Sequence, residues 1–214
     1  MKNNNSFFSC FSLLIIIYLI GAHSCFANTY KDEVNGVTYS YSVGGGEASV
    51  SFVQRGRETI HILASFQATD NVGGENKTFS YKVTSIPQNL FRYNTDLITV
   101  TGMENIKSIG YGAFYSCTSL TSVGDLSKLT SIGEFAFHFC SNLAGELNLE
   151  NVSYIPRYTF TNCESLTKVG DLCMCTSIGE GAFSNCYSLT SVGDLSNCKS
   201  NGGHAFFIVP LWLI

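Results

Sequence analysis

The stretch TSIGEGAFSNCYSLTSVGDL, from Thr176 to Leu195, decides the fold, because closely similar text occurs earlier in the chain. Thr130 to Leu143 reads TSIGEFAFHFCSNL, in register with a period of 23 residues. Several apolar columns keep this period without insertion or deletion. The phenylalanine column is Phe91, Phe114, Phe137, Phe160, Phe183 and Phe206. An isoleucine column runs through Ile86, Ile109, Ile132, Ile155 and Ile178, and Asn201 ends it. Such columns identify a repeat architecture.

The spacing inside one unit indicates a coil built from strands and turns. In one unit, apolar residues recur every three positions, as in Leu120, Val123, Leu126, Leu129 and Ile132. This spacing is too regular for an amphipathic α-helix, whose period is 3.6. Residues 133–140 are expected to form one or two short helical turns. Since one unit cannot bury its own apolar face, the units must stack, about 4.8 Å apart where strands pair. The sequence therefore predicts a repeat solenoid of 23-residue coils over residues 85–214, with a degenerate or truncated last repeat.

Residues 28–84 have the period of two that is typical of half-buried strands. Val37, Tyr39 and Tyr41 alternate with polar residues, and a second alternating segment contains Val50 and Phe52. This part is predicted to be a small β module that caps the open N-terminal end of the repeat core. A ligand-binding role for the module is the alternative.

The first 27 residues are predicted to be a signal peptide. A single Lys2 precedes an apolar run from Phe7 to Ile20, and small residues precede a cleavage site after Ala27. The run is short for a membrane span, which takes about 20 residues. Export to the cell surface or medium is therefore expected, with no membrane-spanning segment after signal removal. A buried N-terminal helix and lipidation at Cys25 are the alternatives.

Composition excludes several classes of protein. Only 13% of the 214 residues are charged, and the formal net charge is −4. A disordered acidic tail or a coiled coil needs far more charge, and nucleic-acid binding needs a basic patch that the chain lacks.

At the C-terminal end of the sequence, residues Phe207 to Ile214 abandon the repeat pattern. This tail indicates either a truncated or shifted reading frame or an apolar lid over the last coil.

Cysteines supply the most reactive side chains, and one column repeats with the period of 23: Cys117, Cys140, Cys163 and Cys186. These positions are expected to be buried free thiols, because free cysteine packs as a small hydrophobe. Disulfides between coils and a metal site at Cys173, Cys175 and Cys198 are the alternatives. No catalytic motif or cofactor fingerprint occurs, so neither an enzyme nor a cofactor is expected.

Two polar surface columns stand out, of which the first is the candidate binding feature and the second is expected to be ordinary solvated surface. The first comprises Asp125, Asn148, Asp171 and Asp194, which could attract a basic partner or Ca²⁺. Its structural alternative is a Gly-Asp turn in which each side chain bonds local backbone. The second comprises Tyr111, Glu134, Arg157 and Glu180, whose alternating charges suit weak exposed ion pairs. The remaining surface is rich in hydroxyl groups, which suits contact with a protein or a glycan.

Residues 85–206 resemble the BspA-like leucine-rich repeats of the treponemal type, through the two stretches quoted at the outset. The segments VNGVTYSY (34–41) and GEASV (46–50) are similar to the N-terminal module of surface proteins from gut Bacteroidales. The resemblance implies a right-handed solenoid, a secreted or cell-surface location, and binding to a host or bacterial surface or matrix protein, as in adhesion. A non-functional or purely structural fragment of a longer repeat array is the alternative.

Overall fold

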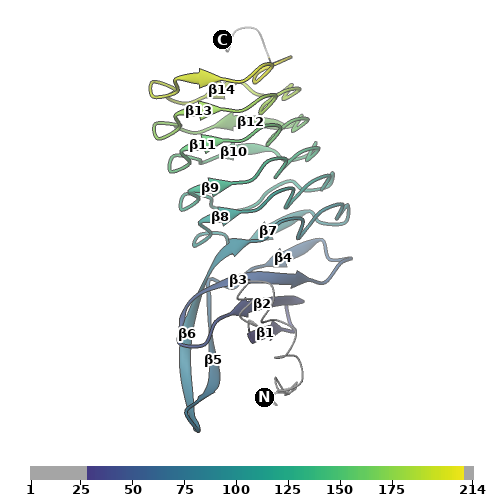
Figure 1. Ribbon diagram of the computed structural model, residues 1–214. Coiled ribbons are helices and arrows are strands. Elements are labelled where there is room, and N and C mark those ends of the chain that lie inside the picture. Colours follow the sequence, from purple (N-terminus) through teal and green to yellow (C-terminus); the bar gives the residue numbers. More distant parts are fainter. Residues whose placement is uncertain (1–27, 210–214) are drawn as a thin grey trace, which may run out of the picture.

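The computed structural model describes residues 28–209 and shows a stack of coils above a β-rich N-terminal part (Figure 1). The predicted signal peptide, Cys25 and residues 210–214 lie outside the described residues. Within residues 28–209 the regular elements are all strands, and none of these residues forms an apolar helix long enough to cross a membrane. The predicted solenoid is confirmed.

The N-terminal part is a β-sheet that covers the first coil. Strand β2 (Val37–Tyr41) lies between β1 (Asn28–Asp32) and β3 (Gly46–Val53) and pairs antiparallel with both. β5 (Ser65–Val72) and β6 (Glu75–Ile86) form a long hairpin, and β6 also pairs with β3 in parallel. The side chains of Val37, Tyr39 and Tyr41 are buried, as the alternation predicts.

Two parallel ladders join the N-terminal part to the coils. The end of β6 pairs with β8 (Ser108–Ile109), which in turn pairs with β9 (Ser131–Ile132). β4 (Thr59–His61) pairs with β7 (Thr99–Thr101). The buried residues of the cap and the coils form one continuous apolar cluster. β6 crosses the predicted boundary between residues 84 and 85, and the division into cap module and repeat array stays a proposal.

The later coils contribute one short strand to each of two further parallel sheets. One sheet contains β10 (Gly145–Leu147), β12 (Leu166–Val169) and β14 (Ser191–Val192). The other contains β11 (Tyr154–Ile155), β13 (Ser177–Ile178) and β15 (Ser200–Asn201). Register partners lie one repeat apart, such as Ile155 and Ile178, so the structure confirms the 23-residue coil.

The third side of each coil is a run of turns rather than the short helical turns expected from the sequence. The Ala113 N–H donates to the Gly110 carbonyl three residues earlier (3.3 Å), whereas the Gly112 N–H donates to Glu134 of the next coil (2.9 Å). Two positions of each coil have a left-handed backbone, with φ of 54° at Gly112 and 56° at Ser116. A left-handed residue cannot continue a right-handed helix, so the backbone bonds to its neighbouring coil instead.

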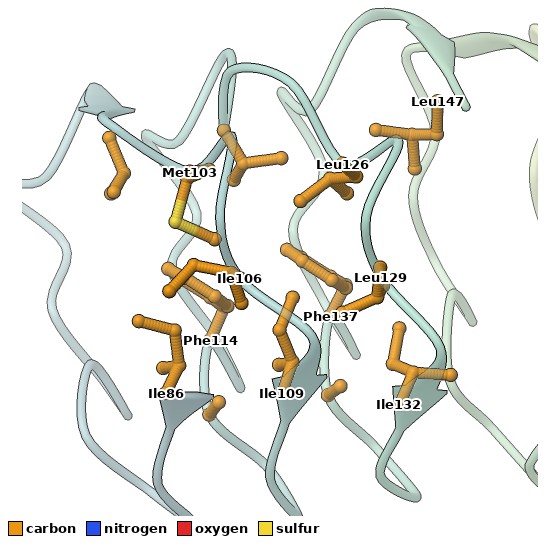
Figure 2. Packing of buried hydrophobic residues seen from close by; sticks show 14 of the residues in the cluster. Ile86, Met103, Ile106, Ile109, Phe114, Leu126, Leu129, Ile132, Phe137 and Leu147 are labelled. Atoms are coloured by element: carbon orange, nitrogen blue, oxygen red, sulfur yellow. The ribbon is translucent and has the colours of Figure 1, made fainter. Parts of the chain in front are cut away.

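The phenylalanine column forms a continuous spine through the core. Successive rings lie 4.7–5.5 Å apart between centroids and within 8° of parallel. Phe91 to Phe183 are fully buried, whereas Phe206 in the last described coil is partly exposed. Figure 2 shows Phe114 and Phe137 packed beside the isoleucines of the β6–β8–β9 ladder and beside Leu126 and Leu129, which precede β9.

The cysteine column lies beside the spine as free thiols. Each buried thiol donates to the carbonyl of a spine phenylalanine 26 residues earlier, for example Cys140 to Phe114 at 3.1 Å. The other three bonds are 3.0–3.2 Å long. Burial raises the pKa of Cys117 and of Cys186 to about 12. The thiols are therefore small core groups with a satisfied donor, as the column predicts.

The ladders are interrupted between the coil that holds β9 and the coil that holds β11. Pro156 occupies the same column as Gly133, one repeat earlier, and Gly179, one repeat later. The backbone N–H of Gly133 donates to the Ile109 carbonyl (2.8 Å), and the N–H of Gly179 donates to the Ile155 carbonyl (2.7 Å). Pro156 has no N–H to donate to Ile132. The sheet accordingly ends at β9, and a separate one begins at β11. Pro156 thus leaves a weaker junction in the middle of the array.

Candidate binding surfaces

The polar column of candidate residues lies in the turns that follow one edge of the array, and all four members are exposed. Asp125, Asn148 and Asp194 each accept a hydrogen bond from the backbone N–H two residues later, at 2.8, 3.1 and 2.8 Å. Asp171 instead accepts from the Asp194 N–H of the next coil, at 3.3 Å. The bonds of Asp125 and Asp194, which each follow a glycine, correspond to the Gly-Asp turn. A binding role for the column stays a prediction.

The second column forms one exposed ion pair, between Arg157 and Glu134, rather than an alternating series. Arg157 Nε lies 2.9 Å from a carboxylate oxygen of Glu134. Glu180 accepts a hydrogen bond from the Tyr158 hydroxyl at 2.5 Å. Exposed pairs of this kind contribute about 0–1 kcal/mol each. As a result, the carboxylates of Glu134 and Glu180 both already have a partner within the chain.

The hydroxyl-rich surface is also partly used within the array. Thr121 and Thr190 donate their hydroxyl protons to the carbonyls of Ile98 and Thr167, one repeat earlier, at 3.0 Å each. Thr130 and Thr176 form equivalent bonds along the other ladder. These hydroxyls tie successive coils together and keep their acceptor capacity for a ligand.

The third side of the coils carries a cluster of aromatic rings that the sequence analysis did not single out. Seven rings from four successive coils form what we call the aromatic turn face: Tyr93, Tyr111, Tyr115, Phe135, His138, Phe139 and Tyr158. They form a connected set, with centroids of contacting rings 4.5–6.5 Å apart. Two arginines flank the face. Arg92 lies 4.7 Å from the centroid of the Tyr115 ring, and Arg157 lies 5.8 Å from that of Phe135.

The rings come from four different columns, and this explains why the periodicity did not reveal them. Each column mixes aromatic, polar and small residues, as in Tyr93, Ser116, Phe139 and Asn162. The turns bring the columns together, because rings from different columns contact one another across successive coils. A search for aromatic residues within five positions of the spine phenylalanine in successive units would have found the cluster.

His138 lies at the centre of the aromatic turn face and is held neutral by its surroundings. Its ring stacks with Tyr115 at 5.1 Å and with Phe135 at 5.5 Å. Its Nδ1 is buried and has no hydrogen-bond partner among the described residues. Loss of solvation lowers the pKa of His138 from 6.5 to about 4. The cluster therefore behaves as an apolar surface at neutral pH.

The low pKa of His138 predicts a loss of stability in mild acid. Below pH 6.5 the unfolded chain binds a proton that the folded chain excludes, so stability should fall as the pH drops from 6.5 to about 4. We expect a loss of about 1–2 kcal/mol, because the ring is partly exposed and solvent screens part of the shift. Urea denaturation at both pH values measures it. His138→Tyr, which places the residue type of Tyr115 in the same column, should show a flatter pH dependence than the wild type, and parallel curves would contradict the assignment.

Among the described residues, no group of three or more His, Cys, Asp or Glu side chains is placed to hold a metal ion. Cys173 is exposed, Cys175 is buried and Cys198 is intermediate, and all three are free thiols. The structure therefore does not bring them together as the metal site that was one alternative for these cysteines.

Comparisons with known proteins agree with this architecture. The family model of the BspA-type leucine-rich repeat region matches residues 84–209 in six copies. No curated protein matches the sequence. The crystal structure of a leucine-rich cell surface protein from Faecalibacterium prausnitzii is similar, with 28% identity and a TM-score of 0.67. The match covers 85% of this chain and 46% of that one, so the chain spans less than half of the relative's length.

The leucine-rich repeat protein of Treponema pallidum shares the fold, with 18% identity, a TM-score of 0.55, and coverage of 90% of this chain and 92% of that one. A leucine-rich repeat protein from Eubacterium ventriosum has 18% identity and a TM-score of 0.52, and the match covers 88% of this chain and 53% of that one. No enzyme family is indicated, and the family is consistent with protein–protein interaction. With six repeat copies that cover more than half of its length, the chain belongs to the BspA-type leucine-rich repeat family.

Proposed function

We propose that this protein is exported and acts at a cell surface by binding another protein, as in adhesion. The aromatic turn face is the observation that carries the proposal. Aromatic residues and arginine are enriched at protein interfaces, and they supply most of the residues whose removal weakens binding. Residues 1–27 support export, and the similar protein from F. prausnitzii is described as a cell surface protein.

The repeat scaffold suits such a role because it is stiff and presents whole rows of side chains. The buried spine and the two ladders fix the spacing of successive coils, so little conformational entropy is lost when a partner contacts several of them. Such an array binds through many weak contacts. We expect affinity weaker than micromolar, on the order of −8 kcal/mol or less favourable, for the described coils.

Two experiments test the proposal. Expression of the full chain in a bacterium should yield an exported protein whose N-terminus is Asn28, and an unprocessed cytoplasmic product would contradict export. Purified residues 28–214 should bind saturably to at least one of four immobilised targets: matrix proteins, mucin, host cells or bacterial cells. Asp171→Ala, outside the aromatic turn face, should change this affinity by less than twofold. Absence of binding to all four would favour a purely structural segment, and turnover of a substrate that one point mutation abolishes would indicate an enzyme.

A further inference from the structure

We propose that the aromatic turn face binds an extended proline-rich segment of a partner protein, in the polyproline II conformation. This inference rests on the proposed function and names the chemistry of its partner. Four observations carry it: the exposure of the rings, the backbone conformation that holds them, the hydrogen-bonding groups around them, and the spacing of the rings.

Several rings of the face are accessible. Tyr93 is 56% exposed, and Tyr111 and Phe139 are each 43% exposed. The remaining rings of the cluster are partly buried by one another. The result is a row of ring surfaces along the stacking direction of the coils, which suits a long, narrow ligand that lies across several coils.

The backbone under these rings is strained. Tyr93, Phe135, Phe139 and Tyr158 have φ between 56° and 59°, in the left-handed region that bulky residues rarely adopt. In other coils the same columns mostly carry small or polar residues, among them Gly112, Gly181, Asn162 and Asn185, which tolerate this conformation, and Ile208 is the exception. The fold therefore does not require aromatic residues at these positions. Strain of this kind is concentrated at functional sites, and two of the four strained residues, Tyr93 and Phe139, have exposed rings.

The polar groups of the face can supply hydrogen-bond donors to a ligand. Glu134 and Glu180, the carboxylates beside it, are already bonded to Arg157 and Tyr158. Among the described residues, the tyrosine hydroxyls of the face that form hydrogen bonds are those of Tyr93 and Tyr158, so the hydroxyls of Tyr111 and Tyr115 can each donate a proton to a ligand. A proline-rich segment offers apolar rings and carbonyl acceptors, and proline has no N–H. A glycan would present donors as well as acceptors, and the two carboxylates beside this face, which would accept best from it, already have partners.

The spacing of the rings also fits such a segment. Tyr93 and Phe139 occupy the same column two coils apart, with the small Ser116 between them. Two coil steps amount to about 9.6 Å, from a strand spacing of about 4.8 Å. Prolines three residues apart in a polyproline II helix are separated by about 9.3 Å. Two such prolines would therefore each lie on one of the two rings, as in other aromatic surfaces that bind proline-rich peptides.

The test uses fluorescent decaproline as the probe and a glycine–serine peptide of equal length as its control. Residues 28–214 should bind decaproline saturably and the control peptide at least tenfold more weakly. The double variant Tyr93→Asn/Phe139→Asn should lose at least tenfold in affinity for decaproline while its Tm stays the same or rises, because Asn already occupies this column at Asn162 and Asn185. Asn185→Ser, which repeats the residue type of Ser116 outside the cluster, should bind within twofold of the wild type.

The outcomes separate this inference from the proposed function. If decaproline does not bind, or if the double variant binds it as tightly as the wild type, the inference is overturned. If the wild-type protein does not bind decaproline but binds the oligosaccharide cellohexaose, and the double variant loses that binding, the face binds a glycan and the inference is overturned. In each of these cases the four-target assay still decides the proposed function. Loss of both decaproline and surface binding in the folded double variant would support both.

Discussion

Phe137→Asp is expected to unfold the repeat array. Phe137 is fully buried, and its ring stacks between Phe114 at 4.9 Å and Phe160 at 5.5 Å. Loss of a buried ring costs about 3–5 kcal/mol, and a carboxylate in its place would have no partner to offset its desolvation. The sum approaches the whole stability of a typical domain, about 5–15 kcal/mol. Thermal melts followed by circular dichroism should show no cooperative transition near that of the wild type.

Ser122→Asp is the control for this prediction. Ser122 is exposed on the same repeat array, and a substitution there should change stability by about 0.5 kcal/mol or less. Equal melting temperatures for Phe137→Asp and Ser122→Asp would contradict both the register of the coils and the position of the spine.

Gly102→Ala is expected to separate the first coil from the N-terminal sheet. Gly102 follows β7 and has a φ of 78°, and a Cβ built on it would lie 1.8 Å from the carbonyl oxygen of Ile62. The backbone next to β4 would have to move, and the β4–β7 pairing with it. We expect a loss of more than about 3 kcal/mol, in the range of the most damaging single substitutions. Urea denaturation measures this loss.

Gly145→Ala isolates the steric part of that effect. Gly145 has nearly the same backbone conformation, with a φ of 83°, but a Cβ there would have no neighbour within 4 Å. It should lose only the conformational part, about 1 kcal/mol. If both substitutions had the same cost, the close approach of the first coil to β4 would be wrong.

The core of this fold could be predicted from the sequence because it depends on single columns. Each column of the array meets itself one coil later, so identity at a spacing of 23 residues translates directly into contact. The phenylalanine spine and the thiol column are correct for this reason. The period of two likewise placed β2 and β3, since a half-buried strand needs only its own alternation. It was wrong at the end of β3, where a register shift against β2 buries Val53 and leaves Phe52 58% exposed.

The turns and the aromatic turn face could not be predicted in the same way. The stretch around Ala136 and Phe137 has a composition that suits a helical turn, but hydrogen bonds to the neighbouring coil, such as Phe137 N–H to the Thr159 carbonyl at 2.9 Å, replace the helical ones. These bonds depend on the stacked neighbour, which a local pattern does not contain. The rings meet across different columns for the same reason, as Phe135 and Tyr158 of successive coils do.

Pro156 has a consequence for how the array responds to stress. In a linear array each coil is held only by its neighbours, so cooperativity is transmitted through the successive interfaces between coils. The interface at Pro156 lacks a ladder bond that the neighbouring ones have. We therefore expect correlated opening to stop there, so that the protein unfolds as two cooperative units. One unit contains the N-terminal sheet and the coils through β9, and the other contains the coils from β11 onward. All but one of the rings of the aromatic turn face belong to the unit that the N-terminal sheet anchors, so that surface can persist while the distal coils fluctuate.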